Sequence, residues 1–310
     1  MVFNTLAGSL HICGFINLNH YDNDKFKKRF LQETTLRNLS ARTSQSYWWH
    51  IEDYTNFHKQ DPEQTGIEEL RSYFQSMLSD GKHKPGSVKM GYYALKFLFT
   101  QVYHKEWAKE YLPTPKIAKT LPLVLSQEEV RDVLGSIPNF KHRTLIMFIY
   151  STGTRISECV NIKLTDIDSK RGQVNIREGK GLKQRMVPLS PLLLTTLRRY
   201  YKAYKPQHYL FEGAGGKGTH LGVTAVREIC LKARYRTPHI HKRYTPHTFR
   251  HSFATHLLEQ GANLLVIQRL MGHSDLRNTL KYLHVQQLAI EQVVNPLDNL
   301  ENMEVLCKSK

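Results

Sequence analysis

Four side chains near the C-terminus are of the types that phosphodiester chemistry uses. His247 and Arg250 lie three residues apart, His273 follows a glycine, and Tyr282 comes nine residues later. An arginine can bind a phosphate through its planar fork, a histidine can move a proton near neutral pH, and a tyrosine can act as a covalent nucleophile. In a strongly basic chain, this combination indicates chemistry on the phosphodiester backbone of DNA.

A predicted helix start positions the first two of these side chains. Thr245 and Pro246 are typical of an N-cap followed by the first helical position. His247 and Arg250 then share one face of the first turn, where free backbone amides attract an anion. Taken alone, the pair is more typical of an ordinary helix surface, so its functional interpretation depends on the context.

Two glycines mark the helix ends that precede the other two side chains, His273 and Tyr282. Gly261 ends the first helix and Gly272 ends the next one, which predicts that His273 lies on a tight turn just past a helix C-terminus. Ser274 is expected to cap a last helix that carries Tyr282. The chain has 16 tyrosines, and only this context distinguishes Tyr282 from the others.

Further cations occur upstream. Arg155 stands at a predicted helix start after a glycine, where it could instead pair with Glu158. Lys180 lies between two glycines, in the expected turn of a β-hairpin, and Lys183 and Arg185 follow closely. The residues alone leave open which of these cations takes part in the reaction and which only contacts phosphate.

A metal centre is not predicted. His247 and His251 have the four-residue spacing of zinc ligands on a helix, but no glutamate lies between them and Arg250 would repel a cation. The four cysteines are scattered and form no Cys-x-x-Cys pair, which argues against a zinc ribbon or a disulfide framework and favours a reducing cytosol. We therefore expect no metal and no other cofactor.

The length and net charge of the chain indicate how many domains it has and what kind of partner it binds. The 310 residues suffice for two domains with cores of their own. The 44 lysines and arginines exceed the 27 acidic residues by 17, which favours a polyanionic partner, although a ribosome-associated factor would have a similar balance. Residues 1–16 are too short and too polar for a membrane helix and lack a basic leader, so neither a membrane segment nor a signal peptide is expected.

The periodicity of apolar residues predicts a first half made of helices and a second half that adds a few strands. Residues 40–111 contain four stretches with helical spacing, and the proline-rich segment 112–122 is typical of an extended linker. Between residues 166 and 189 the period changes to two, which predicts two strands joined by the Gly-Lys-Gly turn. Helices are expected again around 191–204 and 222–234.

Five motifs together carry a resemblance to a known family. They are Gly-Thr-Arg-Ile-Ser-Glu (153–158), Gly-Lys-Gly-x-x-x-Arg (179–185), Pro-His-Thr-Phe-Arg-His-Ser-Phe-Ala-Thr-His (246–256), Met-Gly-His-Ser (271–274) and Tyr-Leu-His (282–284). In this order they resemble the tyrosine recombinases, also called phage-type integrases, and are most similar to the Xer-like and element-borne integrases of bacteria. The resemblance covers roughly residues 25 to 290.

The resemblance implies a set of catalytic residues, which are Arg155, Lys180, His247, Arg250, His273 and Tyr282. In such an enzyme the arginines bind the non-bridging oxygens of a DNA phosphate, and the lysine protonates the departing 5′ oxygen. The histidines assist proton transfer, and the tyrosine forms a 3′-phosphotyrosyl link without metal or ATP. No family position is substituted in this chain.

The resemblance also implies a fold, partners and a location. The expected fold is mainly α with a small antiparallel sheet, made of a helical, SAM-like core-binding domain and an α+β catalytic domain. The expected divisions are a flexible extension (1–22), the core-binding domain (23–112), a linker (113–124), the catalytic domain (125–290) and a tail that docks on a neighbouring subunit (291–310). The expected partners are double-stranded DNA with a specific recombination site, further subunits in a tetramer on two sites, and accessory DNA-bending proteins, in the bacterial cytoplasm.

Two alternative functions remain open from the sequence. One is strand relaxation of the topoisomerase IB kind, which the absence of a large clamp-forming insertion disfavours. The other is a DNA-binding regulator that keeps the fold without catalysis, which the intact residue set disfavours. The sequence names neither the target site nor the element or pathway that the protein serves.

Overall fold

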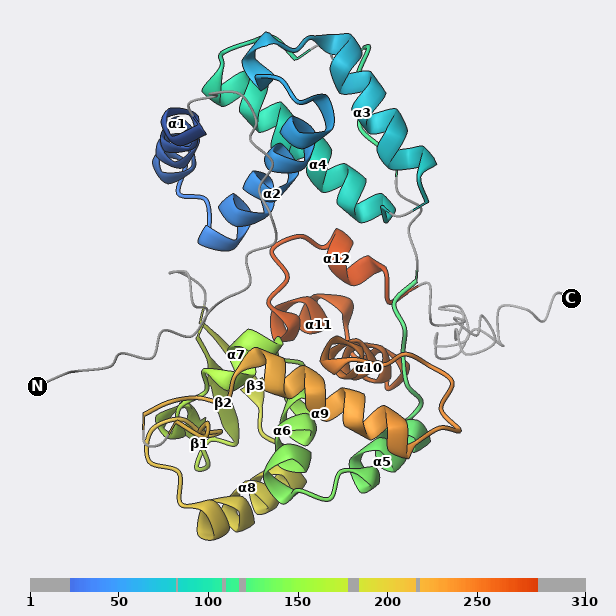
Figure 1. Ribbon diagram of the computed structural model, residues 1–310. Coiled ribbons are helices and arrows are strands. Elements are labelled where there is room, and N and C mark those ends of the chain that lie inside the picture. Colours follow the sequence, from blue (N-terminus) through green and yellow to red (C-terminus); the bar gives the residue numbers. More distant parts are fainter. Residues whose placement is uncertain are drawn as a thin grey trace, which may run out of the picture. The chain divides into compact units, whose positions relative to one another are not determined.

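The chain divides into two compact units, residues 1–119 and 120–310 (Figure 1). The structure is a computed structural model that describes residues 23–81, 83–107, 110–116, 121–177, 184–215 and 218–283. These residues are mainly helical and include one three-stranded antiparallel sheet, which confirms the predicted fold class.

The first unit is a helical domain with an aromatic core. Its elements are α1 (Asn23–Leu36), α2 (Ala41–His58), the 3₁₀ turn η1 (Pro62–Gln64), α3 (Ile67–Ser79), α4 (Pro85–Phe97) and the π-helical turn η2 (Leu98–Val102). Ser40 begins α2 as its N-cap, and its Oγ accepts a hydrogen bond from the Thr43 amide at 3.1 Å. Helices α2 and α4 pack on each other around buried rings such as those of Tyr54 and Tyr73.

A short helix predicted around Trp107 and Tyr111 does not form among the residues described there. The Trp107 side chain is instead buried in the core, where its Nε1–H donates to the Tyr92 hydroxyl at 2.9 Å. That hydroxyl donates in turn to the carbonyl of Leu112 at 3.1 Å. The prediction was wrong because these side-chain hydrogen bonds hold an irregular segment against the core.

The second unit combines helices with the three-stranded sheet. Its elements are α5 (Gln127–Ser136), α6 (Phe140–Thr152), α7 (Ile156–Val160), the turn η3 (Leu164–Asp166), β1 (Ile167–Asp168), β2 (Gln173–Ile176), β3 (Arg185–Pro188), α8 (Pro191–Tyr204), α9 (Val223–Arg236), α10 (Pro246–Glu259), α11 (Leu264–Met271) and α12 (Arg277–Leu280). The strand order is β1-β2-β3, and Val174 pairs with Val187 in the centre of the register. No helix in the described part of the chain is both long enough and apolar enough to cross a membrane.

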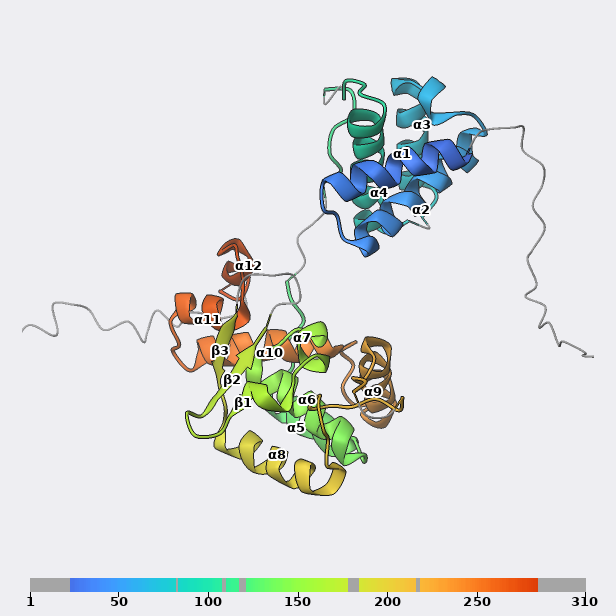
Figure 2. The same ribbon diagram turned by 90° about the vertical axis from the view of Figure 1, so that its left-hand side faces the viewer.

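Helices α6, α10 and α11 of the second unit pack in succession and lead to strand β3. Helix α10 packs along α6 in the core, and α11 lies against both α10 and β3 (Figures 1 and 2). Gly153 ends α6 with a φ of 61°, a left-handed conformation that glycine adopts without strain. A Cβ at this position would lie 2.4 Å from the ring of Phe253, so the chain turns into α7 through a space that only glycine fits.

The segment around Tyr282 differs from the prediction. Helix α12 starts after Leu276 and ends at Leu280, so Tyr282 lies in the following turn, and its amide donates to the carbonyl of Thr279 at 3.0 Å. The start of the helix is held by Asp275, whose carboxylate accepts from the Arg277 amide at 2.9 Å, and not by Ser274. The prediction that Ser274 caps a helix carrying Tyr282 is therefore wrong.

Candidate active site

The first turn of α10 forms as the sequence predicted and presents two of the candidate residues. Thr245 is the N-cap, Pro246 is at the first position, and the Thr245 amide donates to Oγ1 of Thr248 at 3.0 Å. His247 is exposed on this turn, whereas the Arg250 side chain is only 4% exposed. A guanidinium buried to this degree requires partners inside the protein.

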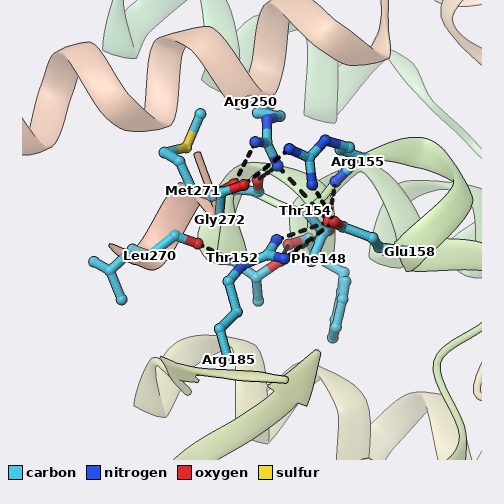
Figure 3. A network of polar contacts seen from close by, with 11 residues as sticks. Phe148, Thr152, Thr154, Arg155, Glu158, Arg185, Arg250, Leu270, Met271 and Gly272 are labelled. Carbon is cyan, nitrogen blue, oxygen red and sulfur yellow. Dashed lines mark hydrogen bonds and ion pairs between the residues drawn. The ribbon is translucent and has the colours of Figure 1, made fainter. Parts of the chain in front are cut away.

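Three arginines from three elements surround one buried carboxylate, that of Glu158 (Figure 3). Arg155 donates from Nη1 to Oε1 at 2.6 Å and from its backbone amide to Oε2 at 2.7 Å. Arg185 forms a fork, with Nη1 at 3.0 Å from Oε1 and Nη2 at 2.7 Å from Oε2. Nη1 of Arg250 lies 3.7 Å from Oε2. The cluster has three positive charges and one negative charge, and therefore favours a further anion.

The carboxylate of Glu158 stays ionised in this cluster. Burial alone would raise its pKa, but the hydrogen bonds and charges of Arg185 and Arg155 outweigh burial and lower the pKa to about 2. Burial lowers the pKa of Arg250 to about 10, and the positive charge of Arg155 acts in the same direction. Arg250 therefore remains a cation at neutral pH, so the excess of positive charge persists there.

Three consecutive carbonyls at the C-terminal end of α11 each accept a hydrogen bond from a different arginine (Figure 3). The pairs are Leu270 with Arg185 at 2.7 Å, Met271 with Arg250, and Gly272 with Arg155 at 3.0 Å. The last carbonyls of a helix have no partner within the helix, and the negative end of its dipole attracts cations. The end of α11 thus fixes the spacing of the arginines and carries His273 directly after it.

Tyr282 lies fully buried beside the arginine cluster. It belongs to a small buried core that includes Ala254, Leu258 and Met271, and its hydroxyl is 2.8 Å from Nδ1 of His251. Burial raises the pKa of Tyr282 to about 12, against a lowering effect of the Arg250 charge. The phenol is therefore protonated at neutral pH, and His251 is the side chain that contacts its oxygen.

The histidines near Tyr282 are held neutral. Burial, followed by the positive charges nearby, lowers the pKa of both His251 and His273 to about 4. The His273 ring lies nearly parallel to that of Tyr282, with centroids 6.4 Å apart, and its Nδ1 is 2.9 Å from Oγ1 of Thr279. The pKa of His247 is also lowered, by partial desolvation of the ring although the residue is exposed overall, and by the charges of Arg250, Arg227 and Arg155. His251 and His273 therefore add no positive charge to the cluster at neutral pH.

Comparison with known proteins identifies the family. The model of the phage integrase family matches residues 124–288, and the model of the phage integrase N-terminal SAM-like domain matches residues 26–109. The chain belongs to the phage integrase family. The match spans both units, so the resemblance seen in the motifs is confirmed.

Relatives of this family member include named recombinases. A Sinorhizobium fredii protein that carries the name integrase/recombinase y4qK is 36% identical over 275 residues, which cover 88% of this chain and 89% of the relative. The tyrosine recombinase XerA of Pyrococcus furiosus is 38% identical over 198 residues, covering 63% and 68% of the two chains.

Solved structures of recombinases share the fold of this integrase-family chain. A lambda integrase dimer bound to a COC′ core site matches with a TM-score of 0.71 and 16% identity, over 87% of this chain and 98% of that one. The XerH recombinase in a post-cleavage complex with a palindromic difH substrate matches with a TM-score of 0.67 and 21% identity, over 88% of each chain. At these identities the likeness concerns the fold.

The structure of this integrase-family chain brings five of the six candidate residues into one site. Arg155, His247, Arg250, His273 and Tyr282 are linked by the contacts above or by electrostatic interactions with Arg250. Lys180, like Lys183, lies outside the described residues. In the part of the chain that is described, no group of three His, Cys, Asp or Glu side chains could hold a metal ion.

Two residues of the site were not assigned by sequence reasoning. His251 was considered only as a zinc ligand, and Arg185 was one of several cations of undecided role. The signal for Arg185 was present, because it forms part of the Gly-Lys-Gly-x-x-x-Arg motif. His251 follows Arg250 directly, and its contact with Tyr282 spans 31 residues, so no local spacing revealed it.

Proposed function

We propose that this chain, a tyrosine-type site-specific DNA recombinase, cleaves a DNA strand by attack of the Tyr282 hydroxyl on a phosphate bound by Arg155 and Arg250. The observation that carries the proposal is the gathering of a buried phenol, neutral histidines and two anchored guanidinium groups within one family-specific site. These groups supply a nucleophile, proton acceptors and positive charge for a phosphoryl transfer.

The phosphate would be bound where Arg155 and Arg250 face each other. Both guanidinium groups are anchored to backbone carbonyls, so they are oriented before DNA binds. Two planar forks can donate to both non-bridging oxygens, and this arrangement stabilises the charge that develops in the pentavalent transition state. The Arg155 side chain is 36% exposed, so a phosphate has access to it from solvent.

The bond changes of cleavage balance without a cofactor. The Tyr282 oxygen forms a bond to phosphorus and loses its proton, while the bond from phosphorus to the 5′ oxygen breaks and that oxygen takes up a proton. His247 and His273 are proposed to assist the proton transfers. Because Tyr282 is fully buried, its hydroxyl must be uncovered before it reaches a phosphate, and we propose that duplex binding causes this movement.

The covalent product explains how strands are exchanged. A 3′-phosphotyrosyl link keeps the energy of the broken bond, so the free 5′ hydroxyl of another strand can reverse the reaction and join to the new partner. Exchange between two sites requires several active sites, and we propose a tetramer on two duplexes, with residues 291–310 docking on a neighbouring subunit and accessory proteins that bend the DNA. We also propose that the protein works in the bacterial cytoplasm, on DNA of the mobile element that encodes it.

Adduct formation tests the proposed function. Nicked duplexes prepared from the DNA that flanks the gene are incubated with the protein and analysed on a denaturing gel. We expect a covalent protein–DNA band with a subset of these duplexes, whereas a regulator that keeps the fold would bind DNA without forming the band. Relaxation of supercoiled DNA without exchange between two sites would instead favour a topoisomerase-like activity.

Lys180 is proposed to protonate the departing 5′ oxygen, and Lys183 serves as its matched neighbour. We expect Lys180→Ala to slow adduct formation by on the order of 10²-fold, because general acid catalysis typically contributes that much or more. Lys183→Ala should have a smaller effect, since a lysine that only contacts phosphate contributes to binding. The comparison uses initial rates at saturating protein, and the reverse order of the two effects would assign the acid to Lys183.

Chelation is expected to leave cleavage unchanged. In the proposed reaction the arginines neutralise the phosphate charge, so no step depends on a divalent cation. The measurement compares rates of adduct formation with and without excess chelator at constant ionic strength, because DNA binding itself depends on salt. A loss of cleavage in chelator that added Mg²⁺ restores would return a metal to the mechanism.

A further inference from the structure

Arg185 directs its donors into the protein. It is the first residue of β3, and its side chain is 9% exposed. Nη1 and Nη2 donate to the two oxygens of Glu158, and Nε donates to the carbonyl of Leu270 at 2.7 Å (Figure 3). The side chain is therefore committed to a carboxylate and a helix end in the interior, whereas Arg155, which contacts the same two groups, is 36% exposed and reaches the surface.

The carboxylate that Arg185 binds is a potential competitor of the substrate. Glu158 is 7% exposed and already contacts Arg155, while Arg250 lies 3.7 Å away. A buried carboxylate without full compensation draws nearby cations toward itself, because leaving it unpaired is costly. The bidentate contact with Arg185 compensates the charge of Glu158, so the positive charges of Arg155 and Arg250 are left in excess and can attract a phosphate.

The same side chain fixes the end of α11. Its Nε binds the carbonyl of Leu270, the residue before those that accept from Arg250 and Arg155. The contact is tight, because a Cβ built on Gly272 would lie 2.8 Å from Nη1 of Arg185. Arg185 thus links β3 to the turn that carries His273.

We propose that Arg185 is a positioning residue for strand cleavage: it neutralises Glu158 and anchors the end of α11, so that Arg155 and Arg250 stay available to the scissile phosphate. This inference rests on the proposed function, because it assumes that the two arginines bind that phosphate. Arg185 itself is not expected to touch DNA.

The test is a pair of substitutions that separates charge compensation from packing. Arg185→Gln should slow adduct formation on the nicked duplex by on the order of 10²-fold, the size of effect seen when one charge-stabilising donor is lost, while duplex binding is retained. The double variant with Glu158→Gln and Arg185→Gln should form the adduct at least about tenfold faster than Arg185→Gln alone, because the second change removes the unpaired carboxylate. Arg185→Lys keeps the charge without the fork and should fall between Arg185→Gln and the wild type.

Arg177→Gln is the matched control. Arg177 follows β2 and pairs with another buried carboxylate, that of Asp166, at 2.6 Å. Among the described residues, Arg177 makes no contact with the arginine cluster. Its adduct rate should equal that of the wild type. Thermal unfolding of each variant checks that the comparison is made on folded protein.

The outcomes distinguish this inference from the proposed function. If wild-type protein forms no adduct, the proposed function fails, and the variants are not needed to show it. If wild type forms the adduct, an Arg185→Gln rate equal to wild type would overturn the inference. A double variant no faster than Arg185→Gln, or a folded Arg185→Lys variant as slow as Arg185→Gln, would also overturn it.

Discussion

Tyr282→Phe is expected to abolish the covalent protein–DNA adduct while duplex binding persists. Phenylalanine fills the same buried space between α10 and α11 but lacks the oxygen that would attack phosphorus. Loss of a catalytic nucleophile costs on the order of 10⁴-fold or more in rate, because the covalent bond to phosphorus can no longer form. The measurement is the fraction of nicked duplex that becomes protein-linked on a denaturing gel, with binding followed separately by mobility shift.

Tyr201→Phe provides the control for this substitution. Tyr201 lies on α8 with 51% of its surface exposed, so removal of its hydroxyl should leave adduct formation and duplex binding unchanged. Retention of the adduct in Tyr282→Phe would show that another residue is the nucleophile. Loss of duplex binding in the same variant would mean that Tyr282 supports the binding surface, and the adduct result could then not identify the nucleophile.

Local chemistry allowed much of the second unit to be predicted. Thr245 begins α10 as its N-cap and Pro246 is the first helical residue, as their residue types predicted. Gly272 ends α11 in the left-handed conformation, as predicted. Each of these signals acts within three or four residues, so it can be recognised in the sequence alone.

The contacts that unite the site are of long range and escaped sequence reasoning. Arg185 reaches Glu158 across 27 residues, and Arg250 reaches the carbonyl of Gly153 across 97. No spacing in the sequence identifies these hydrogen-bond partners, because tertiary packing decides which buried carboxylate or carbonyl meets which guanidinium. The family resemblance singled out Arg155 and Arg250, and a pair of Arg155 with Glu158 was foreseen from their spacing. The contacts of both arginines with the end of α11 emerged only from the structure.

Very short elements were also not predicted from the sequence. Strand β1 has two residues, Ile167 and Asp168, too few for an alternating pattern to be recognised. Helix α12 has four residues, and Tyr282 falls in the turn after it. The motifs thus singled out Tyr282 as the candidate nucleophile, but its local conformation was not predicted.

Arg250→Lys is expected to slow adduct formation by about 10²- to 10³-fold, the loss that follows removal of one donor that stabilises transition-state charge. The guanidinium reaches the carbonyls of Gly153 and Met271 from its two Nη atoms and stays charged, since its pKa is about 10. A lysine ammonium is a point charge on a flexible stem and cannot hold both carbonyls and also present a fork to phosphate. Initial rates at saturating protein measure the effect, and thermal unfolding shows whether the variant is folded at the assay temperature.

Arg277→Lys is the matched control, because Arg277 pairs with Asp275 at 2.8 Å in the same C-terminal region but its side chain is 86% exposed. An exposed pair of this kind contributes little, so its adduct rate should equal that of the wild type. A folded Arg250→Lys variant with a normal rate at saturation and weaker duplex binding would place Arg250 among the residues that only bind DNA. The charge that stabilises the transition state would then have to come from Arg155, and the pairing of two arginines around one phosphate would be wrong.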